Sequence, residues 1–150
     1  MKLSILRKLA TASLILIVFL TSTVLLTRRE NAWSRPADIT VPDQYSTIQA
    51  AIDNAVDGDT IFVKSGTYYE HLIVGKSVAL VGENKDTTVI DGSYSGIVVN
   101  VSRNGVNVSG FKITHSGNSW NIGGPPYSAG VFLTGASYCS LHDNNIVSNG

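Results

Sequence analysis

The chain of 150 residues has little cysteine and little charge. Its single cysteine, Cys139, excludes an internal disulfide framework and any metal site that needs paired cysteines. Charged residues make up only 15% of the chain, whereas glycine occurs 14 times. Such a composition is typical of one turn-rich β domain and argues against a helical bundle.

The few charges are unevenly distributed. Residues 1–36 hold six basic residues and one acidic residue, a net charge of +5, whereas residues 37–150 hold five basic and ten acidic residues, a net charge of −5. Because the larger part has no stripe of positive charge that could contact phosphates, we expect no nucleic-acid partner.

The amino terminus carries a run of 19 uncharged residues, from Leu9 to Thr27. This run is longer than the core of a signal peptide, about 7–15 residues, and long enough to span a bilayer, which takes about 18. No small-residue cleavage site follows it directly, so an uncleaved signal anchor over residues 1–29 is favoured over a cleaved signal peptide. We expect residues 1–29 to contact the membrane, residues 30–38 to form a linker, and residues 39–150 to form a domain outside the cytoplasm, anchored at the cell surface or secreted.

One short amphipathic helix is predicted near residues 46–55. Its apolar residues recur at i, i+3, i+4 and i+7 and therefore share one face: Ile48, Ala51, Ile52 and Ala55. Ser46 and Gln49 have the spacing of a capping box at the start of this helix.

The rest of the chain consists of short runs of strand-forming residues separated by turn residues. The runs lie at residues 39–41, 61–63, 72–74, 78–81, 89–90, 97–99, 106–108, 111–113, 131–133 and 139–141. Strands of this size and density predict an all-β sandwich, barrel or solenoid.

An internal repeat favours the solenoid. Residues 96–100 resemble residues 130–134 at an offset of 34, and residues 106–113 resemble residues 139–146 at an offset of 33. Without the irregular stretch 118–128, the basic period is about 22 residues, within the range typical of solenoids.

Alternation within the repeat predicts which side chains fill the interior. Val106 and Val108 face one way and Asn107 the other, and the equivalent of Val108 one repeat later is Leu141. We therefore expect interior ladders that pair two sets of residues, Ile97 with Val131 and Val106 with Cys139. The apolar face of the helix then covers the first rung, as a capping element does.

Six motifs in a fixed order carry a family resemblance: Thr47–Ile52, Gly58–Val63, Gly66–Glu70, Lys76–Gly82, Val89–Gly92 and Val108–Ile113. Over about residues 39–150 the chain resembles the amino-terminal part of right-handed parallel β-helix proteins of the pectin-lyase-like superfamily. Residues 142–150 are similar to the repeat of NosD-like copper-binding proteins and of carbohydrate-binding and sugar-hydrolase modules. The resemblance implies an all-β, right-handed parallel β-helix with a short capping helix, but no single activity, because this fold carries many functions.

Members of this family have more rungs than the chain supplies. A solenoid that stops after a repeat exposes a strand edge, which proteins normally cover. We therefore expect the natural protein to continue beyond residue 150.

The body offers no convincing catalytic or metal-binding set. Pectin methylesterases share the Thr47–Ile52 motif, but their two aspartates and arginine on later rungs have no match here; Asp91 is interpreted as a turn residue and Arg103 as a loop charge. Cys139 and His142 are three residues apart and therefore face opposite sides of a strand. We expect no catalytic residue, no metal and no cofactor within these residues.

The stretch 117–128 interrupts a regular rung and adds Trp120 and Tyr127 beside amide side chains. A flat ring next to hydrogen-bonding groups suits a sugar, which is apolar on its face and polar at its rim. We expect Trp120 to share a face with Tyr127 or Tyr138 and to bind polysaccharide; the alternative is that Trp120 packs the loop onto the β wall. Asn100 and Asn107 fit the acceptor pattern for N-glycosylation.

These observations predict a cell-surface or secreted protein that binds polysaccharide or has a structural role. The alternative is a polysaccharide lyase, hydrolase or esterase whose catalytic rungs lie beyond residue 150.

Overall fold

A computed structural model describes residues 38–117 and 128–150. The predicted anchor at residues 1–29, and the loop residues Trp120 and Tyr127, lie outside this part of the chain. Within the described residues, no helix has the length and apolar character that a membrane crossing needs.

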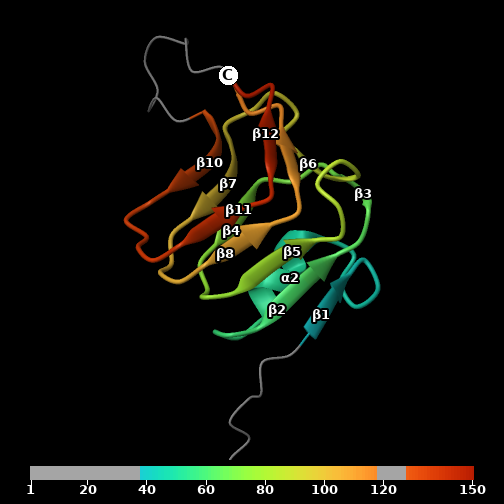
Figure 1. Cartoon of the computed structure of the whole chain (residues 1–150), viewed down its shortest axis with the longest axis vertical. Helices are drawn as coiled ribbons and strands as arrows, with labels where there is room; N and C mark the ends of the chain where they lie inside the picture. Colours follow the sequence, from blue (N-terminus) through green and yellow to red (C-terminus); the bar gives the residue numbers. More distant parts are fainter. Residues whose placement is uncertain (1–37, 118–127) are drawn as a thin grey trace, which may run out of the picture. The chain divides into compact units, whose positions relative to one another are not determined.

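The described residues form short strands and one helix (Figure 1). In chain order the elements are β1 (Asp38–Val41), α2 (Ile48–Asn54), β2 (Thr60–Val63), β3 (Gly66–Tyr68), β4 (Leu72–Val74), β5 (Ala79–Gly82), β6 (Thr88–Asp91), β7 (Ile97–Val101), β8 (Asn107–Ser109), β9 (Lys112–Thr114), β10 (Ala129–Leu133), β11 (Ser140–His142) and β12 (Asn145–Val147). Most of the predicted runs are strands, whereas β3 and β12 have no counterpart among the predictions.

The strands form three sheets in which every described pairing is parallel. Sheet A has the order β1-β2-β5-β8-β11, sheet B the order β12-β9-β6-β3, and sheet C the order β10-β7-β4. The chain passes through A, B and C in turn and then returns to A, and we call each such passage a rung. Figure 1 shows β2, β5, β8 and β11 stacked in this order. This predominantly parallel β structure confirms the predicted fold class and is compatible with a parallel β-helix.

The rungs differ in length. In sheet B, Gly66 pairs with Thr88, which is 22 residues later and equals the predicted period. In sheet A, Thr60 pairs with Ala79 after 19 residues, and Asn107 with Ser140 after 33. The turns take up these differences, so the period of 22 does not hold throughout.

The interior is filled by side chains that alternate along the strands. Val106 and Val108 are buried, as predicted, and Leu80 and Val108 pair in register in sheet A. Leu141 continues this column on β11, but it is 37% exposed. The prediction that Leu141 is an interior residue like Val108 is therefore wrong, because no described strand lies beyond β11 to cover it.

One predicted ladder has the wrong register. Ile97 pairs with Ala129, and Val131 pairs with Val99, so the offset between β7 and β10 is 32 and not 34. A shift of two residues leaves the face of each side chain unchanged, and it places Val131 beside the fully buried Val99. The similarity of Gly96 and Gly130 was misleading, because Gly96 precedes β7 whereas Gly130 lies inside β10.

The second predicted ladder is confirmed. Asn107 pairs with Ser140, which aligns Val106 with Cys139. Cys139 is half-buried and packs against the hydrophobic core, as a small apolar side chain does.

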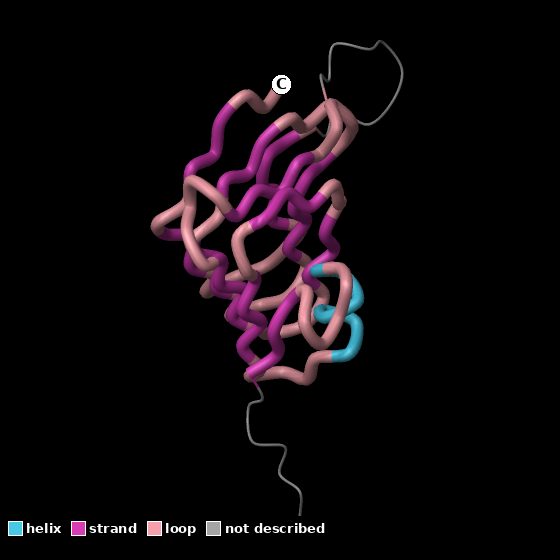
Figure 2. Tube along the Cα trace, turned by 90° about the vertical axis from the view of Figure 1, so that its right-hand side faces the viewer, coloured by secondary structure: helices cyan, strands magenta, loops and turns pink. Residues whose placement is uncertain are grey.

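The helix α2 packs its apolar face into the core at one end of the stack (Figure 2). Ile48, Ala51 and Ile52 are buried, and the helix contacts β1, β2 and β4. The predicted covering of the first rung is therefore present, because these apolar side chains close the interior at β1 and β2.

The start of α2 differs from the predicted capping box. Thr47 is the N-cap, and its hydroxyl accepts a hydrogen bond from the Ala50 amide at 3.1 Å. The side chain of Gln49 instead accepts from the Ile73 amide. The Glu70 carboxylate accepts from the Ile48 and Gln49 amides at 3.0 and 2.9 Å, so a distant residue supplies the second cap.

Two asparagines join the last two described rungs. The Asn144 side chain accepts from the Phe111 amide at 3.0 Å and donates to the Val108 carbonyl at 2.8 Å. Asn149 makes the same pair of bonds to Ser116 and Ile113. These asparagines satisfy backbone groups at turns between strands, which explains part of the asparagine-rich repeat.

Candidate functional site

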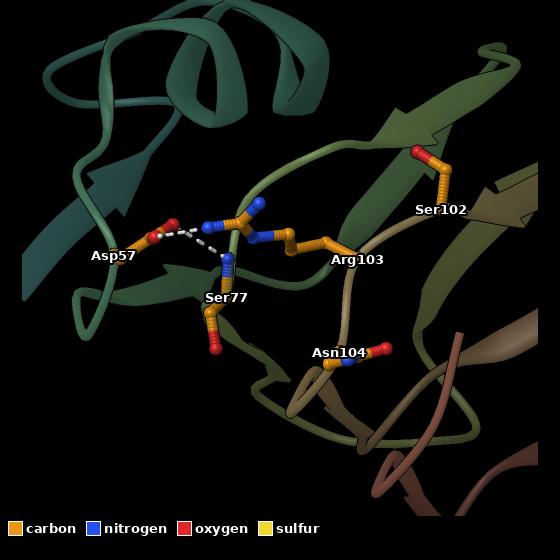
Figure 3. Close-up of a pocket in the computed structure, with 5 residues that line it drawn as sticks. All are labelled: Asp57, Ser77, Ser102, Arg103 and Asn104. Atoms are coloured by element: carbon orange, nitrogen blue, oxygen red, sulfur yellow. Dashed lines mark hydrogen bonds and ion pairs between the residues drawn. The ribbon is translucent and has the colours of Figure 1, made fainter. Parts of the chain in front are cut away.

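A polar cavity of about 590 Å³ lies where the chain passes from sheet C to sheet A (Figure 3). The turn between β4 and β5 and the turn between β7 and β8 line it, and one further residue comes from the loop between α2 and β2. The lining residues are Asp57, Ser77, Ser102, Arg103 and Asn104.

An ion pair lies across this cavity. The Arg103 guanidinium donates to the Asp57 carboxylate at 3.1 Å, and both side chains are about half exposed. The Ser77 amide donates to the same carboxylate at 2.9 Å (Figure 3). This hydrogen bond is the main reason that the pKa of Asp57 lies below its ordinary value; burial opposes it, and Arg103 adds to it. At neutral pH the cavity therefore presents a charged acceptor next to a charged donor.

The remaining polar groups hold the turns of neighbouring rungs together. The Asn104 side-chain oxygen accepts from the Ser137 amide at 2.8 Å, and the Gly105 amide donates to the Ser137 carbonyl at 3.0 Å. These two bonds place residue 137 one rung beyond the cavity wall. The next residue, Tyr138, therefore follows directly on the turn that lines the cavity.

Tyr138 has the most exposed ring among the described residues, with 94% of its surface accessible. Its backbone lies in the left-handed region, with φ of 57°. An exposed tyrosine ring offers a flat apolar face and a hydroxyl, as predicted for a sugar-binding residue. The other predicted members of this site, Trp120 and Tyr127, lie outside the described residues.

A second, smaller cavity of about 390 Å³ lies beside α2 and is lined in part by Gln49, Asp53 and Lys76. The Lys76 ammonium donates to the carbonyls of Asp53 and Ala55 at the end of the helix. The Gln49 side chain donates to the Asp53 carboxylate at 2.8 Å. Because these polar groups hold the helix in place, this cavity is the weaker candidate for a ligand.

The two predicted glycosylation acceptors lie on strands. Asn100 is in β7, and its side-chain oxygen accepts from the Thr134 hydroxyl at 2.7 Å. Asn107 is in β8, and its side-chain oxygen is buried without a hydrogen-bond partner among the described residues. Their modification stays a prediction.

Asp91 is not the isolated turn residue that the sequence suggested. It is the last residue of β6, and its carboxylate lies 2.9 Å from Nδ1 of His115. His142 is exposed and pairs in register with Ser109, whereas Cys139 packs on the core. Over residues 38–117 and 128–150, no three His, Cys, Asp or Glu side chains are grouped as a metal ion would require.

The sequence alone did not group the residues of the cavity. Asp57 had been interpreted only as a turn residue after the helix, and Arg103 only as a loop charge. They are 46 residues apart, and only the stacking of rungs brings them together. The available signal was that Ser77 and Ser102 both closely follow strands of sheet C, so their turns stack.

A comparison with protein-family models finds no match for this chain, and a search of curated proteins also finds none.

Proposed function

We propose that the protein is a polysaccharide-binding protein of the cell surface or the secreted space. Its fold is the right-handed parallel β-helix of the pectin-lyase-like superfamily, and residues 1–29 attach it to the membrane or direct its export. The three all-parallel sheets and the ordered motifs of the sequence support the fold. The uncharged run from Leu9 to Thr27 supports the location.

The binding proposal rests on one observation, an exposed tyrosine ring next to a polar cavity. Asp57 supplies a hydrogen-bond acceptor and Arg103 a donor, and the hydroxyls of Ser77 and Ser102 supply both. These groups match the hydroxyls at the rim of a sugar ring. Tyr138, on the adjoining turn, matches the apolar face of the ring.

The charge of the domain favours a neutral polysaccharide. Residues 37–150 carry a net charge of −5, and the only arginine in that range, Arg103, is paired with Asp57. An acidic polysaccharide would meet this negative field without a free guanidinium to bind it. A neutral chain of hydroxyl-bearing sugars meets no such repulsion.

Retention of the full chain on immobilised neutral and acidic polysaccharides tests the proposal. We expect retention on a neutral matrix, a large loss with Arg103→Ala or Tyr138→Ala, and unchanged melting temperatures for both variants. Lys64→Ala is the matched control for Arg103, because Lys64 forms an equally exposed ion pair with Asp43 outside the cavity. Tyr69→Ala is the control for Tyr138, because Tyr69 is 72% exposed and does not line the cavity.

Two results would overturn the proposal. One is wild-type protein that passes every neutral matrix unretained, which would leave a purely structural role. The other is retention that Arg103→Ala and Tyr138→Ala leave unchanged, which would place binding elsewhere on the chain.

A further inference from the structure

A second aromatic surface lies at the turns that lead from sheet B to sheet C. The ring of Tyr94, between β6 and β7, stacks on the imidazole of His115, which follows β9. The ring centroids are 4.3 Å apart and the planes are inclined by 27°. Tyr94 nevertheless remains 73% exposed, so a large part of its surface faces solvent.

The stack is held rigidly from beneath. The Asp91 carboxylate contacts Nδ1 of His115 at 2.9 Å and accepts from the Ser93 amide at 2.8 Å. The Tyr94 amide donates to the His115 carbonyl at 2.7 Å. Burial raises the pKa of Asp91, but the hydrogen bonds from His115 and from Ser93 outweigh it and leave that pKa below its ordinary value. Asp91 is therefore a charged anchor that fixes the imidazole, and the imidazole supports the tyrosine ring.

The backbone of these turns is strained at the same residues. Ser93, Tyr94 and His115 have φ values of 51°, 59° and 56°, in the left-handed region that favours glycine. The sequence places glycine at the neighbouring positions 92 and 96, and yet has a tyrosine and a histidine where glycine would be unstrained. Core packing does not explain the exposed Tyr94 ring, and strain of this kind concentrates at functional sites.

The stack and the polar cavity lie at opposite ends of β7. Tyr94 comes three residues before Ile97, the first residue of β7, and Ser102 of the cavity follows Val101, the last. A strand of five residues is about 16 Å long. A single sugar ring cannot contact both places, whereas a polysaccharide chain can.

We propose that the Tyr94–His115 stack is a second sugar-binding site, on which a neutral pyranose ring of the same polysaccharide packs against the exposed face of Tyr94. The inference rests on the proposed function, because the cavity is the first contact for that polysaccharide. Asp91 and His115 are positioning residues. Two linked contacts on one polymer raise its overall affinity above that for a short fragment, because the second contact forms within the complex.

The experiment compares the affinity of the full chain for a neutral polysaccharide and for a trisaccharide of the same sugar. We expect Tyr94→Ala to lower the polymer affinity about tenfold or more. Tyr94→Phe, which keeps the ring, should retain the affinity, and so should Tyr69→Ala, the matched control with an equally exposed ring. In the Arg103→Ala variant, the trisaccharide should still shift the ring-proton signals of Tyr94 and His115.

The outcomes separate the inference from the proposed function. If Arg103→Ala weakens polymer binding and Tyr94→Ala does not, the second site is refuted and the proposed function stands. Equal losses from Tyr94→Ala and Tyr69→Ala would also refute the second site, because the stack would then have no special role. If the wild-type chain binds neither glycan, both ideas fall.

Discussion

A column of side chains in sheet A allows the same substitution to be made in two environments. Leu80, Val108 and Leu141 lie in register on β5, β8 and β11. Leu80 is fully buried, whereas Leu141 is 37% exposed on the last described rung. Replacing each leucine by alanine therefore removes the same atoms from a closed interior and from a partly open one.

The two losses should differ by about a factor of two or more. At Leu80, the removed carbon atoms contribute about 2.4 kcal/mol of transfer free energy, and the cavity left behind raises the total into the range of about 2–5 kcal/mol. At Leu141, solvent already reaches the side chain, so no closed cavity forms and the loss is about 1.5 kcal/mol or less. For a domain of this size, the Leu80 variant should melt roughly 10–25 °C below the wild type.

Urea unfolding of the full chain, followed by far-ultraviolet circular dichroism, measures both changes, and the slope of each transition shows whether unfolding remains two-state. An equal loss at Leu80 and Leu141 would contradict the reasoning, because it would mean that Leu141 is covered in solution. A negligible loss at Leu80 would show that the inner and outer faces of sheet A are inverted.

Three further predictions concern the helix cap, the asparagine bridges and the ion pair. Glu70→Ala removes the acceptor for two amides at the start of α2 and should cost about 1–2 kcal/mol; a urea midpoint equal to that of the wild type would exclude the capping role. Asn144→Ala leaves the Phe111 amide and the Val108 carbonyl without this partner and should cost about 1–3 kcal/mol, whereas Asn144→Asp, which keeps the acceptor, should cost less; the reverse order would contradict the assignment. Since the pKa of Asp57 is lowered in the folded state, its contribution to stability is complete above the unfolded value of about 3.9 and is lost as the pH falls through the folded value. Asp57→Asn should therefore reduce the drop of the urea midpoint below about pH 4, and an undiminished drop would show that other carboxylates cause it.

Local pattern was enough to predict most strands and the faces of their side chains. The alternation around Asn107 correctly placed Val106 and Val108 in the core, because a strand in contact with the interior on one face has a period of two. The strand β3 was missed because Gly66–Tyr68 lacks a run of β-branched apolar residues, and β12 because its asparagine was assigned to the repeat turn. The N-cap was misplaced by one residue because Ser46 and Thr47 are both good capping residues.

Features that depend on the stacking of rungs could not be predicted from local pattern. Rung lengths from 19 to 33 residues mean that no single period brings Asp57 to Arg103 or Asp91 to His115. The register of β10 failed for a related reason, since a shift of two residues preserves the side-chain face and leaves the hydrophobic pattern unchanged. Only the stacked backbone fixes which turns are neighbours, and the candidate site is built entirely from such turns.

Titration of the isotope-labelled full chain with a soluble neutral oligosaccharide, followed by amide chemical shifts, tests most directly whether the polar cavity binds sugar. The account predicts that the largest shifts occur at Ser77, at residues 102–104 and at Tyr138, and that Arg103→Ala abolishes them while Lys64→Ala leaves them intact. Shifts confined to residues away from these turns, or no shifts at saturating oligosaccharide, would contradict it.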